Sequence, residues 1–146
     1  MEDWKISAIE KLKQYEAKRQ ALEIIPMQIA EIESTMTSIR SGANIAPVSG
    51  GKSTGKDNML LSCIVQKEEL QRNLDRVKLW IEFMDKGLNI LDQDERKLLD
   101  RFYITGGRRA AEDLAGEFAA DVKTIYAWKD RALRKFTIAL YGCVES

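Results

Sequence analysis

The stretch FAADVKTIYAWKDRALRKF, residues 118–136, decides the expected fold. Its apolar residues recur mainly every three or four positions, which places them on one face of an α-helix: Ile125, Trp128, Ala132, Leu133 and Phe136. Asp121 stands just before this face begins, and aspartate is a preferred N-cap residue. Residues 119–121 are therefore expected to form a tight turn that leads into an amphipathic helix.

Two shorter helices are expected upstream of this turn. Asp92-Gln93-Asp94-Glu95 has the pattern of a capping box, with Asp92 as the N-cap and Glu95 three residues later. The helix that it opens is expected from Gln93 to about Ile104, where Thr105-Gly106-Gly107 ends it. The next helix is expected from Arg108 to Phe118. About three residues join this helix to the helix that follows Asp121. Two short helices joined in this way match the helix-turn-helix motif, whose second helix lies in the DNA major groove.

The N-terminal part predicts two long amphipathic helices. Apolar residues keep the heptad spacing of a coiled coil from about Asp3 to Arg40, and again from Asp57 to about Leu88. Residues 41–56 lie between them, are rich in Gly and Ser, and are expected to form a loop, with Asp57 as the next N-cap. Pro26 removes one backbone hydrogen bond, so we expect a kink or a short break near residues 24–25.

Two helices of similar length joined by one loop most economically fold back as an antiparallel hairpin. The expected fold is therefore all-α, with a long helical hairpin over residues 1–88 and a helix-turn-helix domain over residues 89–146. A two-helix hairpin of this length cannot bury both apolar faces well. We therefore expect it to form a homo-oligomer or to bind a partner protein.

The composition argues against several classes of function. The chain has 23 basic and 23 acidic residues, so any nucleic-acid binding must depend on a local patch. It has no histidine, the commonest general base and metal ligand, and we expect no catalysis, no metal and no cofactor. Cys63 and Cys143 are expected to be free thiols. Without a signal-like or membrane-spanning apolar run, the expected location is the cytoplasm.

One glycine-rich segment superficially matches a phosphate-binding loop. Gly50 and Gly55-Lys56 have the spacing of that motif, but Asp57 stands where it needs a hydroxyl that binds magnesium. No buried strand precedes the segment. A flexible linker is therefore the expected role.

The helix that begins after Asp121 carries five basic residues and one acidic residue between Val122 and Leu140. If its apolar face is buried, helical geometry turns the opposite edge outward. The residues expected to contact DNA bases are Val122, Lys123, Tyr126, Ala127 and Lys129. Those expected to contact phosphates are Arg108, Arg109, Thr124, Arg131, Arg134 and Lys135. A solvated helix surface is the alternative interpretation of the same residues.

The order of residues in this stretch resembles region 4 of sigma factors. That family typically reads Leu-Gly-Val-Ser, then a polar recognition helix, then Ala-Leu-Arg-Lys-Leu; here Phe118 takes the first Leu place, Asp121 the Ser place, and residues 132–136 the closing signature. Leu91 to Tyr103 resembles the preceding helix of the same family. Two departures are the longer turn at Gly106–Arg109, and Val122-Lys123 where sigma factors usually carry Arg and Glu. The preferred DNA sequence is therefore expected to differ from a standard promoter element.

With the long helical N-terminal part and the ending Ala139-Leu140-Tyr141-Gly142, the whole chain resembles the ArpU and RinA-like late transcription regulators of phages and prophages. This resemblance implies a sequence-specific transcription regulator that binds double-stranded DNA and whose N-terminal hairpin either dimerises or contacts RNA polymerase. The alternative is a helical interaction or assembly protein without base-specific recognition, such as a polymerase-binding protein or a phage packaging adaptor.

Overall fold

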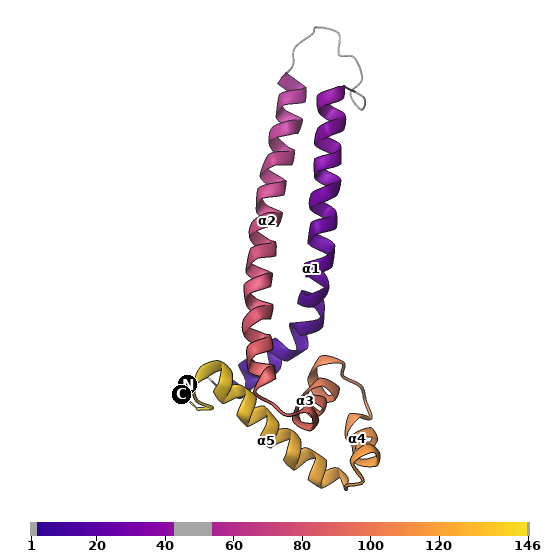
Figure 1. Cartoon of the computed structure of the whole chain (residues 1–146), viewed down its shortest axis with the longest axis vertical. Helices are drawn as coiled ribbons and strands as arrows, with labels where there is room; N and C mark the ends of the chain where they lie inside the picture. Colours follow the sequence, from indigo (N-terminus) through magenta and orange to yellow (C-terminus); the bar gives the residue numbers. More distant parts are fainter. Residues whose placement is uncertain (1–2, 43–53, 146) are drawn as a thin grey trace. The chain divides into compact units, whose positions relative to one another are not determined.

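The computed structural model describes residues 3–42 and 54–145, and it is all-α as expected (Figure 1). The elements are α1 (Trp4–Ser41), α2 (Thr54–Asn89), α3 (Gln93–Leu99), the π-helical turn η1 (Asp100–Ile104), α4 (Ala110–Phe118) and α5 (Val122–Tyr141). Within the described ranges no strand is present, apart from an isolated β-bridge between Asp3 and Glu145. Most of the expected loop, residues 43–53, lies outside the described residues, as does Gly50 of the phosphate-loop-like segment, whereas Gly55 and Lys56 lie in the first turn of α2.

The chain divides into two compact units, and both long helices pass from one unit to the other. The first unit comprises residues 1–19 and 80–146; the second comprises residues 20–79 and is called the arm here. The sequence-based boundary at residue 88 differs from this division. The physical reason is that the first turns of α1 and the last turns of α2 bury Leu12, Met84 and Leu88 within the first unit.

The arm is an antiparallel pair of helices (Figure 1). Lys67 Nζ lies 2.8 Å from Glu33 Oε1, and Lys56 Nζ donates to the Arg40 carbonyl oxygen at 3.2 Å. These contacts confirm the antiparallel direction, because residue numbers rise along α1 as they fall along α2. The apolar residues buried between the helices are Ile29, Met36, Ile39 and Leu74.

Two local expectations for the long helices need correction. The short break allowed near residues 24–25 is absent, because α1 continues as one helix through Pro26 and the same apolar stripe runs on to Ile29 beyond the proline. Packing of that stripe offsets the loss of one backbone hydrogen bond. Asp57 is not an N-cap, because α2 already begins at Thr54. The Asp57 carboxylate lies in the first turn, where the helix dipole favours a negative charge.

The core of the first unit is formed by side chains from every helix of that unit. Its largest fully buried members include Leu12, Met84, Leu88, Leu99, Leu114, Ile125 and Phe136. At Gly87 of α2, a Cβ atom would lie 2.9 Å from Leu140 Cδ2 and 3.0 Å from Phe136 Cε1. The absence of a side chain at this position therefore lets α2 lie close to α5.

The segment from Asp92 to Ile104 confirms the capping box and adds a feature that the sequence did not predict. Asp92 Oδ1 accepts from the Glu95 amide at 2.8 Å, and Glu95 Oε1 accepts from the Asp92 amide at 3.0 Å. After Leu99 the α-helix gives way to a π-helical turn, closed by the Thr105 amide, which donates to the Asp100 carbonyl at 2.8 Å. Gly106 and Gly107 follow with positive φ angles and end the element.

Candidate nucleic-acid interface

The turn between α4 and α5 has the expected length and the expected cap. Ala119 adopts a left-handed conformation (φ 51°, ψ 43°), and the Ala120 amide donates to the Ala115 carbonyl at 3.1 Å. Asp121 Oδ1 accepts from the Thr124 amide at 2.7 Å. Hydrogen bonding from Thr124 holds the pKa of the Asp121 carboxyl below its usual value. The start of α5 is therefore fixed by a charged cap.

A small apolar core holds α4 and α5 against α3. Leu98, Leu114 and Ile125, one from each helix, are buried together. The partly buried side chains around them are Phe102, Ala115, Phe118, Ala120 and Trp128. The Phe118 and Trp128 rings meet edge to face at 6.2 Å between centroids. This core fixes which edge of α5 is buried and leaves the opposite edge to solvent.

The exposed edge of α5 contains most of the predicted base-contacting residues. Lys123 and Ala127 are exposed one turn apart, and Val122 and Tyr126 are exposed to 37% and 46%. Arg131 and Arg134 continue the same side of the helix and are also exposed.

The prediction that Lys129 points outward is wrong. Only 15% of its side chain is exposed, and Nζ lies 2.8 Å from Asp130 Oδ1. The ammonium group is also 5.4, 5.8 and 5.6 Å from the ring centroids of Phe102, Tyr103 and Tyr126. Burial lowers the pKa of Lys129, but the hydrogen bonds to Asp130 and Tyr103 outweigh it and raise the pKa overall. Aromatic faces attract the cation, so Lys129 links α5 to η1 through the Phe102 and Tyr103 rings.

The predicted phosphate-contacting residues fall into two groups. Lys135 Nζ is paired with Glu95 Oε1 at 3.0 Å, Thr124 is half-buried, and Arg131 lines a hollow together with three acidic residues, Asp92, Asp94 and Glu95. In contrast, Arg108, Arg109 and Arg134 are exposed, and in the part of the chain that the structure describes none of them has an ion-pair partner. Arg108 and Arg109 precede α4 instead of opening it, because the helix begins at Ala110.

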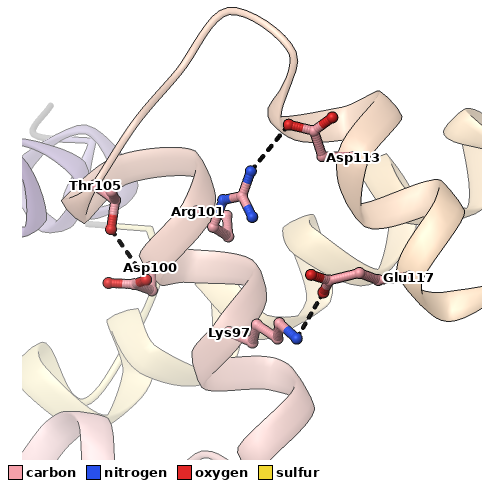
Figure 2. Close-up of polar contacts among 6 residues, drawn as sticks. All are labelled: Lys97, Asp100, Arg101, Thr105, Asp113 and Glu117. Carbon is pink, nitrogen blue, oxygen red and sulfur yellow. Dashed lines mark hydrogen bonds and ion pairs between the residues drawn. The ribbon is translucent and has the colours of Figure 1, made fainter.

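Two of the three acidic side chains of α4, Asp113 and Glu117, are paired with basic side chains of α3 and η1 (Figure 2). Lys97 Nζ lies 2.6 Å from Glu117 Oε2, and Arg101 Nη2 lies 3.0 Å from Asp113 Oδ2. The hydrogen bond from Lys97 lowers the pKa of Glu117. These pairs were not predicted from the sequence, although a signal for them is present. Lys97 and Arg101 are four residues apart, as are Asp113 and Glu117, so each two like charges lie on one face of their helix.

Comparison of the chain with protein-family models, with curated proteins and with solved structures found no match. Among residues 3–42 and 54–145, no group of three or more Cys, Asp or Glu side chains could hold a metal ion, and both cysteines are free. In the same residues, no helix is long and apolar enough to cross a membrane. The function is therefore inferred from the geometry of α4, α5 and their surroundings.

Proposed function

We propose that this chain is a sequence-specific transcription regulator that binds double-stranded DNA through α4 and α5. The observation that carries the proposal is the exposed edge of α5, where Lys123 and Arg134 are accessible and unpaired within the described residues. This edge begins directly after a short, capped turn between two helices, the arrangement that places a recognition helix in the major groove.

In this mechanism the side chains near the start of α5 recognise bases. Lys123 donates to a guanine edge, Val122 and Ala127 contact thymine methyl groups, and Tyr126 contacts a base or a phosphate. Arg134, Arg108 and Arg109 bind phosphates, which fix the register of the protein on the duplex but carry no sequence information. Lys129 acts as a positioning residue, since its ammonium group lies among the rings that support the exposed edge.

The resemblance to sigma region 4 and to phage-type late regulators supports the same proposal. Phe118, Asp121 and the Ala132–Phe136 signature, on which the resemblance was based, lie at the turn and along α5. Regulation by such a protein needs no catalytic group, because binding alone places it on DNA. RNA polymerase is the protein partner that this class of regulator implies.

The proposal is tested by selecting bound sequences from random DNA with the full chain, followed by fluorescence anisotropy on the enriched and shuffled duplexes. We expect a defined motif to emerge, and the enriched duplex to bind at least about a hundredfold more tightly than the shuffled one. The variant Lys13→Ala, which removes an exposed cation of α1, is the matched control and should select the same motif. Failure to enrich any motif would refute base-specific recognition.

A second candidate function is a helical interaction protein whose working part is the arm. Several large apolar side chains of the arm are exposed, including Met27 at 70%, Leu61 at 59% and Leu79 at 66%. Large apolar side chains this exposed are available for contact with a partner protein. Pull-down from nuclease-treated lysate separates the two functions, because partners held through DNA are lost, whereas an assembly partner held by the arm is retained. Retention of RNA polymerase alone fits both functions and does not favour this one.

A further inference from the structure

Four residues on the exposed side of α2 within the arm are spaced symmetrically about residue 70 and are called the symmetric face here: Leu61, Glu68, Arg72 and Leu79. In reverse order the leucines match, whereas the inner pair exchanges glutamate for arginine. Leu61 and Leu79 are 18 residues apart, which is five full helical turns at 100° per residue, so both leucines lie on one face about 27 Å apart. Glu68 follows Leu61 by seven residues, and Arg72 precedes Leu79 by seven residues. Each charged residue therefore lies within about 20° of the line that joins the leucines.

All four side chains of this symmetric face are exposed and available to a partner. Leu61 and Leu79 are 59% and 66% exposed, and Glu68 and Arg72 are exposed as well. Within the described parts of the chain, neither Glu68 nor Arg72 takes part in an ion pair. Asp75, the acidic residue nearest after Arg72, is instead held by Gln71 Nε2 at 3.2 Å.

We propose that this symmetric face binds a second copy of the chain, with the two α2 helices antiparallel and a two-fold axis close to residue 70. In that register Leu61 of each copy packs against Leu79 of the other, and Glu68 pairs with Arg72 of the other copy. Because a two-fold interface is self-complementary, each contact occurs twice. Val65, 45% exposed, and Ile64, 38% exposed, widen the apolar contact beside Leu61.

Charge complementarity selects a second copy over another occupant. The antiparallel register puts opposite charges together at both central positions, whereas a parallel pair in register would place Glu68 against Glu68 and Arg72 against Arg72. A foreign apolar partner would leave both charges without a counter-ion. This pairing uses α2 alone and does not depend on DNA binding, so loss of one property does not imply loss of the other.

Sedimentation velocity of the full chain at low salt tests the pairing. We expect the wild type to sediment as a dimer of twice the chain mass of 16.6 kDa. The single variants Glu68→Arg and Arg72→Glu should each raise the dissociation constant of the dimer at least about tenfold. Lys78→Glu reverses an exposed charge about 100° away from the face and should leave the dimer unchanged. A monomeric wild type, or a dimer that tolerates both reversals, overturns the proposal.

A mixture of the two single variants distinguishes this pairing from an ion pair within one helix. One chain then carries arginine at both positions and the other carries glutamate at both, so only a heterodimer regains the cross-pairs. We expect the mixture to recover the dimer, and a mixture that stays monomeric would contradict the register. Circular dichroism of each variant confirms that the helices are intact.

Disulfide cross-linking tests the direction of the two helices. In a background where Cys63 and Cys143 are serine, a mixture of Leu61→Cys and Leu79→Cys chains should form a covalent dimer, whereas Leu61→Cys alone should not. In the antiparallel register the two copies of residue 61 lie about 27 Å apart, far beyond disulfide reach. Cross-linking of Leu61→Cys alone would show a different pairing and overturn the proposal.

Discussion

The hydroxyl group of Tyr15 donates a hydrogen bond to Oδ1 of Asp85, a residue 70 positions later in the sequence. The Tyr15 oxygen also accepts from Arg19 Nη1 at 3.1 Å, and the tyrosine side chain is almost fully buried. This contact ties the first turns of α1 to the last turns of α2 within the first unit. It helps explain why those turns belong with α3, α4 and α5.

Replacing Tyr15 with phenylalanine should destabilise the first unit. The change removes the donor and leaves the half-buried Asp85 carboxylate unpaired, which costs about 1–2 kcal/mol. Urea denaturation should show a lower midpoint with an unchanged slope. Tyr126→Phe is the control, because the Tyr126 ring is exposed and this variant should lose little stability. Equal midpoints for both variants would contradict the structural role of Tyr15.

Stability should also fall at alkaline pH through the same tyrosine. Burial and the hydrogen bond to Asp85 raise the pKa of Tyr15 above its ordinary value of 10.0, so the folded state keeps the proton longer than the unfolded state does. Its contribution is complete below pH 10 and is lost as the pH rises through the folded pKa. Thermal denaturation between pH 8 and 12 should therefore show a smaller alkaline loss for Tyr15→Phe than for the wild type. An identical alkaline loss would exclude Tyr15 as its source.

Lys123→Ala is expected to change which DNA sequence is preferred. Lys123 is exposed in the first turn of α5, where side chains of a recognition helix contact base edges. Loss of one donor to a guanine should relax the preference at one position by about 1–3 kcal/mol. Selection from random DNA reveals this directly. If the selected motif is unchanged, Lys123 does not contact a base.

Arg134→Ala is expected to weaken binding to every DNA sequence by a similar factor. Arg134 is exposed near the middle of α5 and has no acidic partner in the described residues, so we assign it to a phosphate. The slope of log affinity against log salt should fall by about one, since one fewer counterion is released. Lys135→Ala serves as the comparison. The ammonium group of Lys135 is already paired with Glu95, so its removal should change the slope less.

Ala119→Gly is expected to stabilise the turn between α4 and α5. Ala119 is the only non-glycine residue with a positive φ angle in the described parts of the chain, and glycine adopts that conformation without the strain of a Cβ atom. The gain should be about 0.5–1 kcal/mol, measured by urea denaturation. Ala127→Gly in the interior of α5 should instead destabilise by about 1 kcal/mol. Changes of the same sign would refute the special role of residue 119.

Local sequence patterns predicted the helices and most of their ends correctly. The spacing of apolar residues predicted α1, α2 and α5. The Asp92–Glu95 capping box predicted the start of α3, and Asp121 predicted the start of α5. These features follow from contacts within about four residues, so the sequence contains all of their partners. The same helical geometry correctly predicted that Lys123, Ala127 and Arg134 are exposed to solvent, since each lies opposite the buried face of α5.

Interactions between helices were beyond such reasoning. Lys129 was expected to face outward, but the rings of Phe102 and Tyr103, from η1, draw it inward. The Lys97–Glu117 pair, the unit boundary within α1 and α2, and the unbroken helix at Pro26 likewise depend on which surfaces pack together. Helical periodicity shows which side of a helix is apolar, but the partner that covers that side is chosen by packing between segments distant in the sequence.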